Sequence, residues 1–256
     1  RSNILPVREK SMERRMEMKK SGIDMLHGPI WNKIPLFALP VAATAILGQL
    51  FNASDLAVVG NFAGEARTAA VAAVGANSSV VSLVVNLFTG VALGANVVIA
   101  GAIGREDTDA AQRAVHTALL FAVIGGFVIA LLGELMAEPL LRMMSVPDDV
   151  LPLALLYLRI YLIGMPVILL YNFEAAIFRS IGDTKVPLAT LAISGVINVI
   201  LNLFFVIVLG MTVDGVAIAT VISNAISAVI LFFRLKKAND YIRLDMSKLR
   251  INMRSL

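Results

Sequence analysis

Six long stretches of this 256-residue chain carry no charged side chain, apart from a single arginine in the fourth. About 20 apolar residues in a helix cross the hydrocarbon core of a bilayer, and the six stretches reach or approach that length. Only 16% of the residues are charged and 58% are hydrophobic, which lies outside the usual range of soluble globular chains. The sequence therefore predicts an all-α integral membrane protein with six transmembrane helices.

The expected spans follow these stretches, extended by a few residues at their ends. They cover about 33–59, 68–104, 112–134, 149–178, 186–210 and 213–235. The second span is too long for one straight crossing, so we expect it to be kinked or to protrude from the bilayer. A single helix is favoured over a hairpin of two, because no charged or proline-rich turn interrupts the sequence there.

Lys and Arg residues gather at the two ends of the chain and in two of the loops. Of the 22, all but three lie before the first span, after the sixth, or in the loops after the second and fourth spans. Arg67 and Arg142 lie in the opposite loops, and Arg159 lies inside the fourth span. Since cytoplasmic loops are enriched in Lys and Arg, we expect a multi-pass protein of the cell membrane with both termini in the cytoplasm.

Basic segments flank the six spans. Residues 1–28 are expected to form a basic cytoplasmic arm, 29–237 the six-helix body, and 238–256 a basic cytoplasmic tail or linker. Apolar and basic residues of the arm recur at a spacing of three to four, which suits a short helix on anionic lipid headgroups. A solvated arm explains the same composition equally well, so both interpretations stay open.

Asp55 is an acidic residue near the outer end of the first span, followed directly by apolar residues. Ionisable groups inside spans are costly and commonly have a functional or packing role. We therefore interpret Asp55 as a candidate carrier of a proton or a cation rather than as a hydrated surface group. Arg159 and Glu174 are too far apart along the fourth span to touch each other, and Glu174, close to Arg179, is expected near the cytoplasmic surface.

Neutral polar side chains form stripes on three spans. The stripes consist of Ser78, Ser79, Ser82 and Asn86 on the second span, Ser194, Asn198 and Asn202 on the fifth, and Thr220, Ser223, Asn224 and Ser227 on the sixth. One such stripe is commonly a set of hydrogen bonds between helices. Three stripes together with an acid indicate a hydrated cavity, which a substrate pathway through the membrane requires.

Motifs of the common enzyme classes are absent from the sequence. It contains no GxxxxGK[ST] phosphate loop, no HExxH and no GxSxG, and it has no cysteine. His27 and His116 are far apart in the sequence, which argues against a metal site. We expect no enzymatic activity, no catalytic residue, no cofactor, no metal centre and no nucleic-acid partner.

Segments spread over most of the chain resemble the multidrug and toxic compound extrusion (MATE) family. The most specific is the GDTKVP loop before the fifth span. The matching segments are GPIWNKIPLFALP (28–40), FNASDLAVVG (51–60), AVHTALL (114–120), EPLLRMM (138–144), LPLALLYLRIYLIGMP (151–166), AAIFRSIGDTKVPL (175–188) and GVAIATVISN (215–224).

The resemblance implies an efflux antiporter that exchanges Na⁺ or H⁺ for organic, often cationic, compounds. Such transporters have twelve helices in two six-helix lobes, of which this chain resembles the N-terminal one. Asp55 resembles the ion-coupling acid of the first helix, and Pro40 resembles the proline that lets that helix bend. The resemblance also implies a cavity lined by Tyr157, Asn172, Asn198, Asn202 and Thr220, with a possible Na⁺ near Asp55, Asn198 and Asn202.

Two positions depart from the family pattern. Many members have an aspartate where this chain has Asn202, which puts a coupling scheme with two carboxylates in doubt. Glu174 stands where small residues are common, and whether it compensates for the missing acid is open.

Three hypotheses about function follow. The first is ion-coupled efflux of small organic cations or drugs, with a second six-helix lobe in the same full-length chain or in a partner chain. The second is a flippase-like transporter of lipid-linked precursors, which requires several cationic groups in the cavity. The third is a half-transporter fragment without activity of its own. The sequence leaves the substrate and the choice between Na⁺ and H⁺ open.

Overall fold

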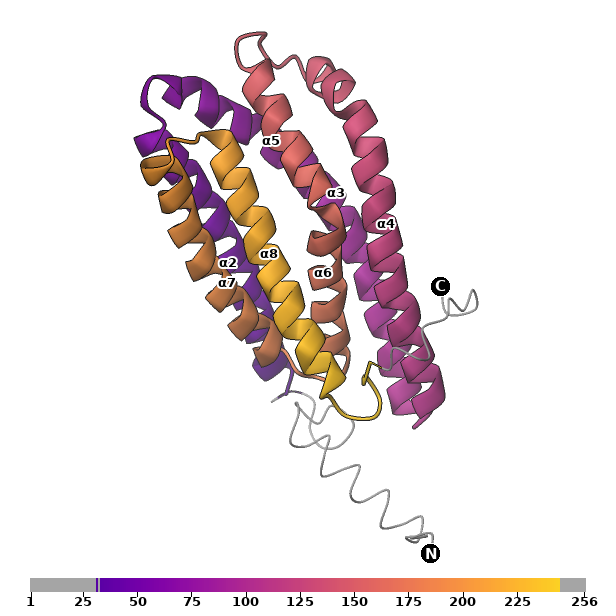
Figure 1. Ribbon diagram of the computed structural model, residues 1–256. Coiled ribbons are helices and arrows are strands. Elements are labelled where there is room, and N and C mark those ends of the chain that lie inside the picture. Colours follow the sequence, from indigo (N-terminus) through magenta and orange to yellow (C-terminus); the bar gives the residue numbers. More distant parts are fainter. Residues whose placement is uncertain (1–30, 32, 245–256) are drawn as a thin grey trace, which may run out of the picture.

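The structure is a computed structural model that describes residue 31 and residues 33–244. The regular elements of these residues are all helical (Figure 1), so the predicted all-α fold is confirmed. The elements are α2 (Lys33–Phe62), the 3₁₀ turn η1 (Gly64–Ala66), α3 (Arg67–Gly104), α4 (Thr108–Met143), α5 (Leu151–Ile163), α6 (Met165–Ser180), α7 (Lys185–Leu203), the π-helical turn η2 (Phe204–Val208) and α8 (Val213–Lys236). The predicted arm at 1–28 lies outside the described residues, as does most of the predicted tail.

The described helices are long and apolar enough for five membrane crossings, and for six if one bent pair forms a single span. Five are long, apolar helical segments: α2, η1 with α3, α4, α7 with η2, and α8. The sixth is the pair α5 and α6, which together are apolar enough to cross but are bent by 53°. Because the number of crossings is even, α2 begins and α8 ends at the same end of the bundle (Figure 1).

The fourth span is therefore two helices, where the sequence indicated one continuous stretch at 149–178. The bend lies at Gly164, and Pro166 follows in the first turn of α6. Proline has no N–H to donate to the preceding turn, and its ring clashes with the carbonyl there. The bend is also closely packed, because a Cβ at Gly164 would collide with Val221 of α8, and a Cβ at Gly126 of α4 would collide with the backbone of Pro166.

Two spans are longer than the bilayer requires. Helix α3 runs without a break from Arg67 to Gly104, so the single helix expected there is confirmed. Helix α4 extends well beyond the apolar stretch at 112–134 and begins at Thr108. The residue before it, Asp107, caps the helix, because its side chain accepts a hydrogen bond of 2.8 Å from the N–H of Ala110. At about 1.5 Å per residue, both helices are longer than the hydrocarbon core is thick, so their ends extend beyond it.

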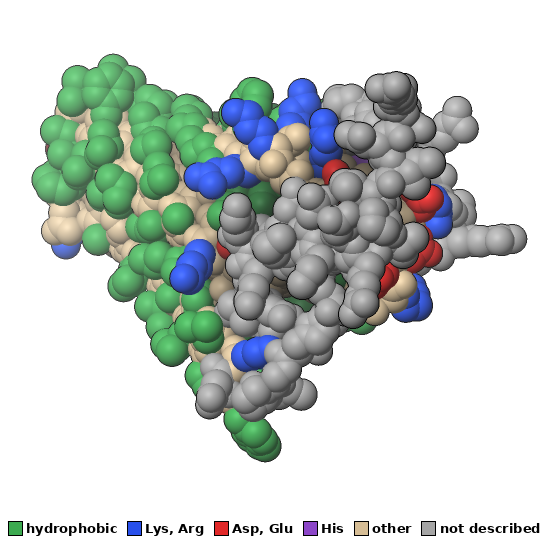
Figure 2. Space-filling model, turned by 90° about the horizontal axis from the view of Figure 1, so that it is seen from below, with side chains coloured by type: hydrophobic (Ala, Val, Ile, Leu, Met, Phe, Trp, Pro, Cys, Tyr) green, Lys and Arg blue, Asp and Glu red, His purple; other side chains and the backbone are tan. Residues whose placement is uncertain are grey.

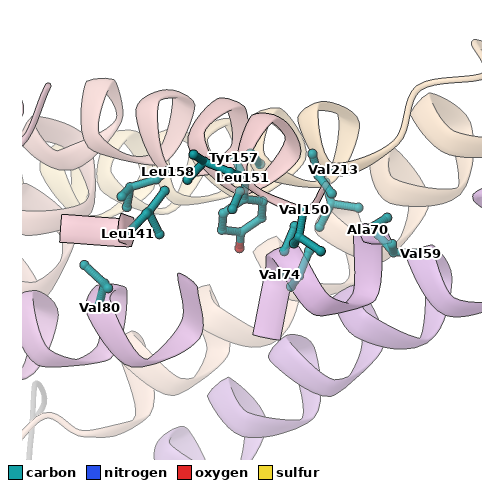
Figure 3. Close-up of a cluster of buried hydrophobic side chains, with 14 of the residues drawn as sticks. Val59, Ala70, Val74, Val80, Leu141, Val150, Leu151, Tyr157, Leu158 and Val213 are labelled. Carbon is teal, nitrogen blue, oxygen red and sulfur yellow. The ribbon is translucent and has the colours of Figure 1, made fainter. Parts of the chain in front are cut away.

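The helices pack in two groups. Helix α7 packs against both α2 and α8 on one side, while α3 and α4 pack against α6 on the other, and α8 contacts both α5 and α6 (Figure 1). One apolar cluster lies among α2, α3, the end of α4, α5 and the start of α8, and Figure 3 shows Tyr157 within it. A second cluster joins α3, α4, α6 and the end of α8. The core thus has separate centres towards the two ends of the bundle.

The outer surface is extensively apolar. Large hydrophobic side chains such as Leu83, Leu87, Phe127, Leu131 and Val196 are mostly exposed, as expected for helices that face lipid or another lobe. Figure 2 shows this apolar surface beside the end of the bundle where Lys and Arg side chains gather. This end is the one where α2 begins and α8 ends. The cytoplasmic orientation of that end stays a prediction.

The GDTKVP loop connects α6 to α7 at this end. Gly182 has a φ of 78°, a backbone conformation that favours glycine. Asp183 Oδ1 accepts a hydrogen bond of 3.1 Å from the N–H of Val186 in the first turn of α7. Burial raises the pKa of Asp183, while the N–H groups of Val186 and Lys185 and the charges of Arg234 and Lys185 oppose the rise. The most specific segment of the sequence is therefore a tight connection that starts a helix.

Candidate ion and substrate site

Asp55 joins three helices that are distant in the sequence. Its side chain lies on α2 and is only 4% exposed. Asn202 of α7 donates a hydrogen bond of 2.5 Å from Nδ2 to Asp55 Oδ1, and Thr220 of α8 donates one of 3.2 Å from Oγ1 to Oδ2. Both carboxyl oxygens therefore have a donor, as a buried carboxylate requires.

Asn198 extends this arrangement into a network of four residues. Its Nδ2 donates to Thr220 Oγ1 at 3.3 Å, and its Oδ1 accepts from Asn202 Nδ2 at 3.2 Å. The remaining oxygen of the pair, Asn202 Oδ1, is buried without a hydrogen-bond partner. We call Asp55, Asn198, Asn202 and Thr220 the Asp55 network. It offers one carboxylate, two amide oxygens and a hydroxyl, the kinds of oxygen ligand that hard cations take.

A cavity of about 330 Å³ borders Asp55 between α2, α3 and α5. It combines polar groups with the rings of Tyr157 and Tyr161, which stack with their centroids 6.1 Å apart. The lining residues are Gln49, Asn52, Ala53, Asp55, Leu56, Val74, Gly75, Ser78, Val81, Ser82, Tyr157 and Tyr161. Asp55 belongs both to this lining and to the network, so an ion bound by the network would be next to a ligand in the cavity.

Close contact between α2 and α7 holds Asp55 against its partners. A Cβ at Gly195 of α7 would collide with the ring of Phe51 on α2. Gly195 lies one turn before Asn198, and Phe51 one turn before Asp55, on helices that pack against each other. The absence of a side chain at Gly195 therefore lets the two helices approach closely enough for Asn202 to reach Asp55.

The structure divides the residues that the resemblance placed around the cavity. Tyr157 lines it, whereas Asn198, Asn202 and Thr220 belong to the network and are not among its lining residues. Asn172 joins neither group, because its Nδ2 donates to the carbonyl of Ile168 on its own helix. Pro40 lies inside α2, which continues through it as one helix.

Other residues that line the cavity were not predicted as lining residues from the sequence. Gln49 and Asn52 precede Asp55 at a spacing of three, which suits one helix face, but polar residues in the first span were not interpreted as a stripe. Tyr161 follows Tyr157 by one turn and lines the same cavity. Ser78 and Ser82 of the polar stripe on the second span also line it.

The two ionisable residues of the fourth span have different surroundings. Arg159 pairs with Glu134 of α4, with 3.4 Å between Nε and Oε2, and its side chain is 49% exposed. The expectation that Glu174 lies near the cytoplasmic surface stays a prediction, but its side chain is fully buried on α6. The reason is that α6 packs between α3, α4 and α8 over the length that includes Glu174.

Comparison with known proteins identifies the family. The MatE family profile matches residues 40–204. "Probable multidrug resistance protein YoeA" of Bacillus subtilis (strain 168) is 30% identical over 222 residues, covering 84% of this chain and 47% of that protein. "Probable multidrug resistance protein YpnP" of the same organism is 30% identical over 206 residues, covering 80% of this chain and 45% of that protein. The chain thus spans about half the length of these curated relatives.

Solved structures agree with this assignment. A crystal structure of a MATE protein in the bent conformation superposes with a TM-score of 0.82 at 24% identity, covering 90% of this chain and 51% of that one. This likeness supports the fold, and the sequence matches support the family. The chain therefore belongs to the MATE family, whose members are membrane transporters and not enzymes.

Proposed function

We propose that this chain is one lobe of a secondary active multidrug efflux transporter, which exports organic compounds by antiport against Na⁺ or H⁺. The observation that carries the proposal is the position of Asp55, between a network of oxygen ligands and a cavity lined by aromatic and polar groups. The names of the two relatives, multidrug resistance proteins, support the same function.

Antiport follows if the ion and the substrate favour opposite conformations of the lobe. A proton or Na⁺ at Asp55 neutralises the carboxylate, while an organic cation in the cavity is attracted to the ionised form. The ion and the organic cation then compete for the negative charge of Asp55, and each of them shifts the equilibrium between the outward- and inward-facing states. The rings of Tyr157 and Tyr161 add a surface on which an organic cation can stack.

The transporter requires a second six-helix lobe, in the same full-length chain or in a partner chain. This part of the proposal rests on the relatives, which are about twice as long as the matched region. The exposed apolar faces of this lobe would contact the second lobe and the lipid of the cell membrane. Both termini of the lobe would lie in the cytoplasm, as the distribution of Lys and Arg indicates.

Lipid-linked precursors are a poorer fit as substrates. A pyrophosphate headgroup requires several cationic groups, and the described cavity beside Asp55 has no Lys or Arg in its lining. The same lining suits a cationic or aromatic compound.

The test is efflux of a cationic dye from cells that express the chain alone or together with a second six-helix lobe. In the combination that exports dye, we expect Asp55→Asn to abolish ion-coupled export. Asp148→Asn is the matched control, because it removes a carboxylate whose side chain is 95% exposed. Undiminished coupled export by Asp55→Asn would overturn the role of Asp55, and a chain that stays monomeric and inactive in every combination would favour a fragment without transport activity.

A further inference from the structure

Glu174 is a second buried acid, separate from the Asp55 network. Its side chain is 0% exposed, and neither carboxyl oxygen has a hydrogen-bond partner. Glu174 lies in the second half of α6, whereas Thr220 of the network lies in the first half of α8. Since α6 and α8 end at the same end of the bundle (Figure 1), the two acids lie towards opposite ends.

The surroundings of Glu174 are apolar. Residues three, four and seven positions away share its face of the helix, and these are Val167, Leu170, Tyr171, Ile177, Phe178 and Ile181. All of them belong to, or pack against, the apolar cluster that joins α3, α4, α6 and α8. The opposing residues in that cluster include Ile99 and Ile103 of α3, Val115 and Leu119 of α4, and Leu231 of α8. Glu174 thus lies at the centre of the face that holds α6 in the bundle.

Charged and titratable groups occur on the elements packed around α6, but none donates a hydrogen bond to the carboxyl group. Towards the end of the bundle where α6 and α8 end, they include the basic residues Arg105 after α3, Arg113 and His116 on α4, Arg179 on α6, Lys185 on α7, and Arg234, Lys236 and Lys237 on or after α8. The acidic ones there include Glu106, Asp107, Asp109, Asp183 and Asp240, and the tyrosines are Tyr171 on α6 and Tyr241 after α8. An ionised carboxylate that is buried without a donor or a counter-charge is far less stable than the neutral acid.

We propose that Glu174 is a proton-binding site, which holds its proton in this conformation and releases it only when α6 moves away from α3, α4 and α8. A metal cation would need several oxygen ligands around the carboxyl group, and the cluster supplies apolar side chains instead. The Asp55 network, by contrast, surrounds its carboxyl group with amide and hydroxyl groups.

In this proposal α6 pivots at the bend at Gly164, where the close contacts with Val221 of α8 and Gly126 of α4 would have to open. The bend separates α6 from α5, so α6 can shift while α5 keeps its contacts beside the cavity. Water that reached Glu174 in the shifted conformation would stabilise the ionised form, so the pH on that side would bias the packing of α6. This inference does not depend on the role of Asp55, and its failure would leave the proposed efflux function intact.

The test is infrared spectroscopy of the full chain in lipid bilayers at about pH 7, well above the range in which a solvated glutamate is protonated. We expect the C=O band of one protonated carboxylic acid per chain, with slow exchange in D₂O. The Asp55→Asn chain, in which a proton at Asp55 cannot contribute, should retain this band, and adding Glu174→Gln to that chain should remove it completely. Glu134→Gln is the matched control, since Glu134 is also a membrane-embedded glutamate but pairs with Arg159, and it should retain the band as well.

Labelling all glutamates with ¹³C at the carboxyl carbon provides a second measurement that needs no substitution. The acid band should shift with the label, because the other described glutamates are exposed or paired, and Asp55 carries no label. In the Asp55→Asn chain, absence of a protonated acid band at about pH 7, or a band that persists on adding Glu174→Gln and does not shift with the glutamate label, would overturn the proposal.

Discussion

Asp55 and Glu174 are two almost fully buried acids in one lobe with contrasting surroundings. Asp55 has a hydrogen-bond donor at each oxygen and borders a cavity, whereas Glu174 has no donor and lies in an apolar cluster. Residue type and burial are therefore insufficient to define the role of an intramembrane acid. The donors around Asp55 can stabilise a charge and share a cation, while the packing around Glu174 favours a bound proton.

The largest expected effect comes from separating α2 from α7. Gly195→Val places a side chain where the ring of Phe51 lies and should destabilise the fold by about 3 kcal/mol, at the upper end of overpacking costs. The thermal unfolding midpoint in lipid measures this effect. Gly90→Val is the control, because a Cβ at Gly90 meets no atom within 4 Å. The infrared band of Glu174 should persist in the folded fraction, and equal destabilisation by the two substitutions would contradict the close contact.

Removing the main donor of Asp55 should make this acid resemble Glu174. Asn202→Leu leaves Asp55 Oδ1 without its donor and should cost about 2 kcal/mol in stability, the usual penalty for an unsatisfied buried polar group. The protonated acid band of Asp55 should then increase in the infrared spectrum at about pH 7. Asn172→Leu is the control, since its amide contacts only its own helix. A spectrum of Asn202→Leu identical to that of the unchanged chain would argue that the network does not stabilise the ionised form.

Replacing Glu174 by an apolar residue should change how stability depends on pH. At neutral pH the folded state holds a proton at Glu174 that the unfolded state has lost, so the free energy of unfolding should fall as the pH rises. Glu174→Met should remove this slope and raise stability by about 1 kcal/mol at neutral pH, because no unsatisfied carboxyl remains. Unfolding midpoints measured from acid to alkaline pH test this prediction, and a slope that is unchanged in Glu174→Met would contradict it.

The smallest expected effect is at Asp183, outside the spans. Because burial raises its pKa, its contribution to stability should be present below about pH 4 and be lost as the pH rises above that value. Asp183→Asn retains an oxygen that can accept from the N–H of Val186, so it should flatten this slope and change stability by less than about 0.5 kcal/mol. A large loss of stability in Asp183→Asn would mean that the charge itself holds the loop.

Much of the fold could be predicted from the sequence, because charged residues inside a bilayer are costly and therefore mark the ends of spans. The six crossings and the unbroken α3 followed from this rule. The bend at Gly164 did not, because its packing against Val221 and Pro166 depends on the tertiary arrangement. A proline and a glycine in sequence allow a bend without requiring one.

The candidate site was also predictable only in part, because it too depends on how the helices pack against one another. Polar stripes at i, i+4 spacing indicate which face of a helix is polar, so Asn198 and Asn202 could be grouped, but the spacing does not say which helix they meet. The burial of Glu174 could not be predicted, because the distance of a residue from the end of its helix does not say which other helices cover it. Burial there depends on three other helices that cover α6.

The most direct test of the central claim, that Asp55 binds the coupling ion, is the unfolding midpoint of the chain in lipid as Na⁺ replaces K⁺ and as the pH is lowered. The measurement is made in the Glu174→Gln background, so that the second acid does not contribute. We predict that Na⁺ or acid raises the midpoint, because a ligand that binds only the folded state stabilises it, and that Asp55→Asn abolishes the rise. A rise of equal size in Asp55→Asn would contradict the claim.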